Sequence, residues 1–339
     1  MPAASRIVVV EDPRATLDFR PRPEAVRRMV EAGLQALART NDTAAAWRRF
    51  IGPEQTVGIK VHAAPGPLSG TRPAVVEALV RSLLEQGHSP DRIVIWDKHR
   101  ENLEKAGFVE LGRRLGVAVE GAVEAGYDPD VFYDNPIPGE LVWGDLEFQP
   151  GQTTMGRRSH VTRLLTGRID RLITVTPLLN HNQLGVSGAL FNLALGSVDN
   201  TRRFLNDPER LAVAIPEICA LPAIADRTAF HVVDALIAQY YGQEESLLHY
   251  ATILNQLRFS TDPVALDLQS IAELARQRQR AGQPKVEVSL APYHNAGLLE
   301  LGAADPERIV LETLRLAPAD TADRPPALSP DPTAATLRP

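Results

Sequence analysis

The sequence predicts an α/β protein with a mainly parallel sheet and helices on both faces. Segments with strand and helix patterns alternate along the chain, and the strand segments are almost wholly apolar, as expected where both faces of a sheet are covered. The 339 residues, 44% hydrophobic and 23% charged, are sufficient for one large core. We expect a single domain over residues 1–316, with residues 120–160 as the place for an inserted β-hairpin, and a disordered proline-rich tail over 317–339.

The first βαβ unit extends from Thr56 to Asp97. Within the strand 56–62, the period of two places Lys60 and His62 on the same face. A loop rich in glycine and proline follows over 63–70.

The helix of this unit is predicted to begin after Thr71, which can act as its N-cap, and to end near Gly87. Residues 92–96 then form the parallel neighbouring strand, which ends at Asp97. The two strands therefore bring polar residues to the same edge.

The remaining elements continue the alternation, with a surface excursion over 127–139. They are helices 101–107 and 109–115, strand 117–119, strand 141–148 at a sheet edge or in an inserted hairpin, strand 171–175 ended by Pro177, a buried helix 186–195, helix 207–220, strands 229–233 and 257–260, a helix begun by Asp262 and Pro263, and a last strand 308–314.

Polar residues gather where these strands end. In parallel sheets, ligands bind at the carboxyl ends of the strands, so this clustering predicts a functional site at that edge. The residues concerned are Lys60, His62, Asp97, His99, Asn180, His181, Asn182, Asp234, Thr261 and Asp262.

Composition limits the classes of partner and cofactor. A net charge of −6 argues against nucleic acid as the main partner. The longest apolar run, 184–195, is too short to cross a bilayer, and residues 1–11 do not resemble a signal peptide, so we expect no membrane partner and a cytoplasmic location. The lone Cys219, expected to be an inert core thiol, excludes an internal disulfide, a cysteine-based zinc site and a protein-held iron–sulfur cluster.

Lys60 is one of only four lysines, beside thirty-two arginines. A lysine retained in such a background can serve chemistry that arginine does not, such as a shifted pKa or nucleophilic attack. With His62, it forms either an anion clamp or an acid–base pair. The structural alternative is a salt bridge from Lys60 to a carboxylate such as Asp97, beside a structural histidine.

Asn180, His181 and Asn182 leave a strand together. A metal site is one interpretation of this region, and a hydrogen-bonded loop is the other. The residues that would ligate a divalent metal are His62, Asp97, His99 and His181.

Two further segments could bind an anion. Ser187 precedes the buried helix, whose first N–H groups could hold an anion, although a simple helix cap explains it as well. Arg202 and Arg203 could grip a carboxylate or phosphate, or could form surface salt bridges. Asp267 is expected on a helix surface and His231 in the core.

The dinucleotide, P-loop and α/β-hydrolase fingerprints are absent. From about Val57 to Leu314, however, the chain resembles the domain of unknown function 362 family. The matching segments are 57–62, 70–73, 92–97 with 106–108, 185–192 with Asn192, 196–204, 231–235 and 261–267.

The resemblance implies a redox association, because many members look like redox-associated proteins. Members commonly carry lysines near the positions of His181 and Asn192, where this chain has Asn180 and Phe191. Lys60 is then the remaining lysine of the matched motifs.

These observations favour an enzyme that binds a small anionic substrate or cofactor at the carboxyl edge. Its site would comprise Lys60, His62, the loop at Gly70 and Thr71, His181 and Arg202. The alternatives are a non-catalytic metal- or cofactor-binding protein and a protein retained for an interaction surface. The sequence leaves the cofactor, the reaction and the oligomeric state open.

Overall fold

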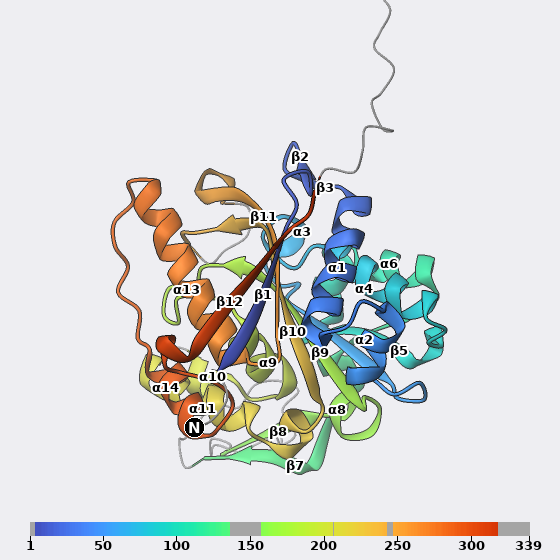
Figure 1. Cartoon of the computed structure of the whole chain (residues 1–339). Helices are drawn as coiled ribbons and strands as arrows, with labels where there is room; N and C mark the ends of the chain where they lie inside the picture. Colours follow the sequence, from blue (N-terminus) through green and yellow to red (C-terminus); the bar gives the residue numbers. More distant parts are fainter. Residues whose placement is uncertain (1–3, 136–156, 206, 243–246, 318–339) are drawn as a thin grey trace, which may run out of the picture.

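The computed structural model describes residues 4–135, 157–205, 207–242 and 247–317. An eight-stranded sheet forms the centre (Figure 1). Its strands are β1 (Ser5–Glu11), β4 (Val57–Val61), β5 (Ile93–Asp97), β6 (Ala118–Gly121), β9 (Arg171–Leu179), β10 (Thr228–Gln239), β11 (Ala251–Ser260) and β12 (Ile309–Arg315). The order across the sheet is β12-β1-β11-β10-β9-β4-β5-β6, and only β11 runs antiparallel to its neighbours. The predicted α/β class with a mainly parallel sheet is confirmed.

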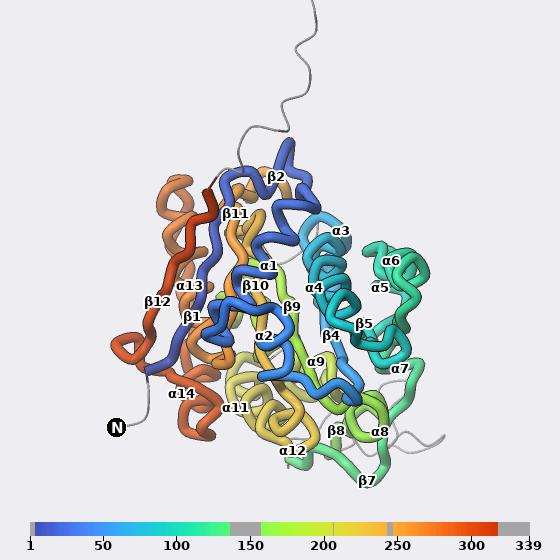
Figure 2. The backbone as a smooth tube through the Cα atoms, turned by 45° about the vertical axis from the view of Figure 1, so that its right-hand side comes forward, coloured from blue at the N-terminus to red at the C-terminus, as the bar shows by residue number. Residues whose placement is uncertain are grey.

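One face of the sheet is covered by α1 (Pro23–Ala38), α2 (Thr43–Phe50), α4 (Pro73–Glu85), α5 (Arg100–Lys105) and α6 (Phe108–Leu115). Val57, Ile59 and Val61 of β4 point into this layer, as the period of two predicts. Figure 2 shows α1 and α4 packed along the strands on this side.

The opposite face is covered by α9 (Ala189–Ser197), α11 (Pro208–Cys219), α13 (Pro263–Arg280) and α14 (Ala291–Leu298), with the short helices α8 (Arg163–Gly167), α10 (Arg202–Leu205) and α12 (Pro222–Ala225). Figure 1 shows α13 and α14 across the sheet from α1. The α9 helix is apolar around nearly its whole circumference and is therefore buried, as predicted. Asp262 caps α13 by accepting from the Ala265 amide at 2.8 Å, also as predicted. Because β11 is antiparallel, Thr261 and Asp262 follow it at the edge opposite to the carboxyl ends of the parallel strands, so their predicted place in the polar cluster is wrong.

The smaller elements lie at the ends of the sheet. They are the hairpin of β2 (Thr16–Leu17) and β3 (Arg20–Pro21), the antiparallel pair β7 (Tyr127–Asp134) and β8 (Arg158–Thr162), the helices α3 (Gly66–Ser69) and α7 (Ala122–Ala125), and single 3₁₀ turns at Pro90–Arg92, Leu248–Tyr250 and Pro306–Arg308. In the described part of the chain, no helix is both long enough and apolar enough to cross a membrane.

Several predicted boundaries are wrong. The β9 strand passes through Pro177 and continues to Leu179. The ladder between β4 and β9 ends at the pair Val61 and Val175. Beyond this pair, β9 is hydrogen-bonded only to β10, so a proline that cannot donate a hydrogen bond is tolerated at position 177.

Part of the expected surface excursion is the ordered strand β7. The predicted strand 141–148 lies outside the described residues, as does the tail from residue 318. The division into a domain, an insertion and a tail stays a prediction.

Candidate functional site

The Lys60 side chain is fully buried on the α9 face of β4. Its ammonium donates to Asp97 Oδ1 at 2.7 Å, Asn192 Oδ1 at 2.6 Å and the Val61 carbonyl at 2.8 Å. Burial lowers the pKa of Lys60, against the opposing attraction of Asp97. Because three acceptors match the three N–H donors of the ammonium, this geometry favours the structural alternative for Lys60.

Asp97 connects the ends of β4 and β5. Besides Lys60, it accepts from the Lys98 amide at 2.7 Å and, through Oδ2, from the Ala63 amide at 2.7 Å. Burial alone would raise the pKa of Asp97, but the charge of Lys60 and these hydrogen bonds keep it below its ordinary value. The ion pair thus holds two strand ends and the start of the 63–70 loop together.

Gly196 of α9 is the residue that leaves space for the lysine. A Cβ at this position would lie 2.2 Å from Lys60 Cε, so Gly196→Ala must displace an ammonium held by three hydrogen bonds. We expect the free energy of unfolding to fall by about 1–3 kcal/mol, measured by urea denaturation. The control Gly167→Ala adds a Cβ with nothing within 4 Å, and equal losses in the two variants would refute the packing argument.

The 63–70 loop is closed by residues at its two ends. The His62 amide donates to Thr71 Oγ1 at 2.9 Å, and the Thr71 amide donates to the His62 carbonyl at 2.9 Å. The Thr71 hydroxyl also donates to the Val175 carbonyl, so its predicted role as helix cap is wrong; Arg72 occupies the N-cap position of α4. A Cβ on Gly70 would meet the Gly66 and His62 carbonyls, and both predicted ligand residues of the loop, Gly70 and Thr71, therefore shape its backbone.

His62 and His181 lie on either side of Phe191. The ring of Phe191 is 6.2 Å from that of His62 and 4.6 Å from that of His181, between centroids. Burial lowers the pKa of each histidine to about 4. At His62, Asp97 and a side-chain hydrogen bond to Asn192 oppose this shift, whereas Lys60 and His181 add to it. Both imidazoles are therefore neutral at pH 7, and His62, at the mouth of the loop, is the more exposed.

Asn192 contacts both Lys60 and His62. Its Oδ1 accepts from Lys60, while its buried Nδ2 has no hydrogen-bond partner among the described residues. A buried donor without a partner is costly, and such groups in folded proteins call for an explanation. Neither the periodicity nor the spacing of the sequence predicts that Asn192 contacts Lys60. Asn192 was a candidate site residue only because it belongs to a segment that matches the family.

Asn180 lies next to the His181 site but faces α13. Its Oδ1 accepts from Arg278 at 2.7 Å, and its Nδ2 donates to Asn182 Oδ1 and the Gly242 carbonyl. Asn182 itself is exposed. The asparagine pair thus forms the hydrogen-bonded loop that was the alternative to a metal site.

The N-terminus of α9 is occupied by a carboxylate of the protein itself. Asp267 of α13 accepts from the Ala189 and Leu190 amides at 2.7 and 3.0 Å, and Ser187 precedes these residues in a fully buried turn. An external anion at this helix end would have to replace Asp267. The expectation that Asp267 lies on a helix surface is wrong: burial raises its pKa to about 7.

Arg203 lies away from the histidines. It donates to Ser159 Oγ and to the carbonyls of Tyr133 and Asn135, and so attaches α10 to the β7–β8 pair. Arg202 is exposed on the same short helix.

The four predicted metal ligands do not form one ligand set. In residues 4–135, 157–205, 207–242 and 247–317, no group of three or more His, Cys, Asp or Glu side chains could hold a metal ion. Asp97 is occupied by Lys60 and two amides, and His99 is exposed at the start of α5. His62 and His181 remain as a pair beside Phe191.

The strands also position a second buried ion pair, which the sequence analysis missed. Asp234 was predicted to end its strand, but β10 continues past it to Gln239, so that predicted boundary is wrong. The Asp234 carboxylate lies 3.1 Å from Arg72 Nη1 and accepts from the Arg72 amide at 3.0 Å. Arg72 stands in the matched segment 70–73, but its partner Asp234 is 162 residues further along the chain, so the sequence did not show that the two residues pair.

These features define a mostly parallel α/β protein with a buried lysine–aspartate pair and two neutral histidines at the carboxyl edge of its sheet. The chain belongs to the domain of unknown function 362 (DUF362) family, whose model matches residues 57–272. No curated protein matches it.

Two solved structures give weak similarities. A crystal structure of a protein from Thermotoga maritima superposes with a TM-score of 0.41 at 15% identity over 78% of this chain, which spans only 60% of that protein. A mitochondrial aspartate aminotransferase from Trypanosoma brucei gives a TM-score of 0.22 at 13% identity, over 91% of this chain and 73% of that chain. Neither similarity bears on function.

Proposed function

We propose that the carboxyl edge binds a small phosphate or carboxylate between His62, His181 and Asn192. The observation that carries the proposal is the buried Asn192 Nδ2, a donor without a described partner beside two neutral imidazoles. The Nδ1 atom of His181 accepts from the Gln183 and Leu184 amides, which leaves its Nε2 to carry the proton and donate. An anion would satisfy both donors.

The Lys60–Asp97 pair supports this site indirectly. Its two charges offset each other, so the pair neither repels an anion nor donates to it. Lys60 is therefore a positioning residue that fixes Asn192 Oδ1 and directs the amide nitrogen away from the ammonium. If the protein is an enzyme, His62 is the candidate acid–base group, because the residue as a whole is more exposed than His181.

Anion binding should be coupled to proton uptake. Burial holds both imidazoles neutral, and a negative charge beside them favours the imidazolium form, which raises their pKa. The bound protein then carries more protons than the free protein, so affinity rises as the pH falls. We expect binding of inorganic phosphate and malonate to tighten by up to about tenfold per pH unit for each proton taken up, measured by titration calorimetry between pH 7.5 and 5.5.

The variant Asn192→Asp tests the same site. It is isosteric, keeps an acceptor for Lys60 and replaces the free donor with a carboxylate that repels an anion. We expect affinity to fall at least about tenfold, or about 1.4 kcal/mol. The control Asn41→Asp makes the same change at an exposed position remote from the site. Equal affinities in the two variants, or affinity that rises with pH, would refute the proposal.

A further inference from the structure

A cavity lies against the 63–70 loop, where Pro67, Leu68 and Ser69 line it. It has a volume of about 320 Å³ and is bounded by the β2–β3 hairpin, α3, the first turn of α4 and the ends of β10 and β11. His62 and His181 do not line it. Its wall is mainly apolar, formed by Phe19, Leu68, Ala74, Ile237, Leu248 and Ala251.

Three of these apolar residues are about half exposed to solvent. Phe19 is 53% exposed, Leu68 49% and Leu248 51%, and all three line the same cavity. Large apolar groups that gather around a concave site are typical of ligand-binding pockets rather than of ordinary surface.

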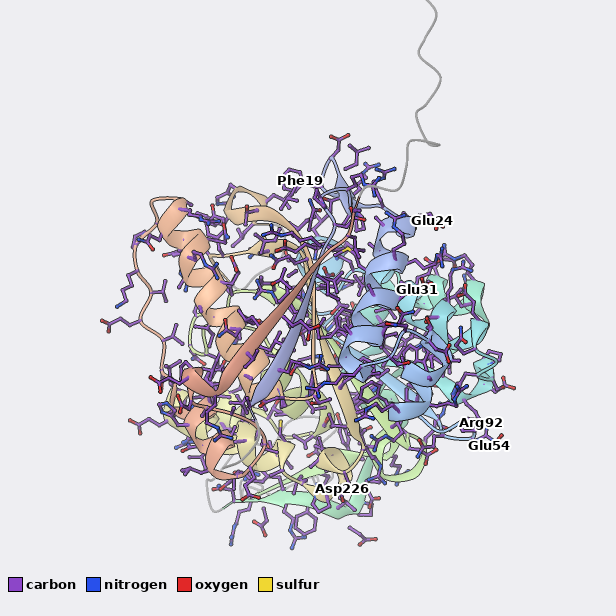
Figure 3. All side chains as sticks on the ribbon, viewed as in Figure 1. Phe19, Glu24, Glu31, Glu54, Arg92 and Asp226 are labelled. Atoms are coloured by element: carbon purple, nitrogen blue, oxygen red, sulfur yellow. The ribbon has the colours of Figure 1, made fainter. Side chains whose placement is uncertain are left out.

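Phe19 is held there by an unfavourable turn. Leu17 pairs with Arg20, so Asp18 and Phe19 form a two-residue hairpin connection, and both have positive φ, 48° and 60°. This arrangement strongly favours glycine at the second position, and a bulky side chain there is strained. Figure 3 shows Phe19 at the tip of this hairpin. Strain of this kind persists mainly at functional positions.

One cation is available at the rim. Arg20 lines the cavity and has no ion pair with the part of the chain that the structure describes. Arg72 also lines it, but its guanidinium is committed to Asp234 and to the carbonyls of Leu68 and Ile237. Among the described residues that line it, the site therefore combines an apolar interior with one arginine, Arg20, that forms no ion pair.

We propose that this cavity binds a small apolar carboxylic acid, with the apolar part between Phe19 and Ile237 and the carboxylate at Arg20. A cavity of about 150 Å³ accepts benzene, so this one has room for an aromatic ring with a short acidic side chain. The proposal concerns a site separate from the histidine pair and does not depend on it.

The test compares phenylacetate with the neutral phenylacetamide by titration calorimetry on the full chain. We expect the wild type to prefer the acid by roughly fivefold, as for an exposed ion pair. Arg20→Gln should abolish this preference. The control Arg22→Gln removes an exposed arginine of the same segment that does not line the cavity, and should keep it.

Phe19→Gly separates binding from folding. Glycine relieves the turn, so the melting temperature should stay equal or rise, while affinity for both compounds should fall about tenfold because the aromatic wall is lost. Ala74→Phe should fill the cavity and abolish binding. The proposal is overturned if neither compound binds the wild type, if the preference for the acid survives Arg20→Gln, or if Phe19→Gly binds as the wild type does.

Discussion

Lys60→Met is expected to lower the free energy of unfolding by about 3–5 kcal/mol, because it leaves Asp97 as an uncompensated buried charge. Methionine matches the length and volume of lysine, so the loss reflects the charge and the hydrogen bonds rather than a cavity. Equilibrium urea denaturation at pH 7 measures the effect.

Two variants make this result specific. Lys105→Met breaks the exposed pair with Glu101, which solvent screens, and should therefore change the free energy of unfolding far less than Lys60→Met does. The double variant Lys60→Met/Asp97→Asn should recover part of the loss, since the buried charge is then removed. If Lys60→Met lowered the free energy of unfolding no more than Lys105→Met does, the buried Lys60–Asp97 pair would not stabilise the carboxyl edge as proposed.

Acidification is expected to destabilise the protein steeply between pH 6.5 and 4. Burial lowers the pKa of His62 and His181 to about 4 and that of His231 to about 3, so these groups take up protons when the chain unfolds. Their stabilising contribution is present above pH 6.5 and is lost as the pH falls towards the folded-state pKa values.

Asp267 acts in the opposite direction. Burial raises its pKa to about 7, so it releases a proton on unfolding between about pH 4 and 7, and its contribution is lost as the pH rises. Near pH 5, three protons taken up by His62, His181 and His231 against one released by Asp267 leave a net uptake of about two, or about 3 kcal/mol per pH unit. His88, whose pKa burial also lowers, adds to this uptake.

Urea denaturation at pH 7, 6 and 5 checks this slope. His231 is fully buried, with Nδ1 bonded to Thr174 Oγ1 at 2.7 Å, so His231→Asn should reduce the slope by about one proton. A free energy of unfolding that stays constant over this range would show that the histidines are not buried in their neutral form.

The fold class follows from local patterns, whereas long-range pairing does not. Alternating strands and helices predict the parallel sheet, and Asp262 with Pro263 predicts the start of α13. The prediction starts at Thr56 and misses β1, α1 and α2, although the β-branched run 7–10 is a strand signal. The partners of β1 are β11 and β12, some 250 to 300 residues away, as in the pair Ser5 and Ile309.

The candidate site shows the same division. The period of two places Lys60 and His62 on one face, and the rule for carboxyl ends brings His181 to the same edge. The hydrogen bonds that hold this site together come from residues of α9 and α13. Asn192 reaches Lys60 across 132 residues, and Asp267 caps α9 across 78, so neither could be assigned from spacing.

The most direct test of the anion site is an NMR titration of the imidazole nitrogens of His62 and His181, with and without saturating inorganic phosphate. We predict that both imidazoles stay neutral down to about pH 4 to 5 in the free protein and that phosphate raises the pKa of at least one by a unit or more. Identical titration curves with and without phosphate, at concentrations where calorimetry detects binding, would place the anion elsewhere and contradict the account.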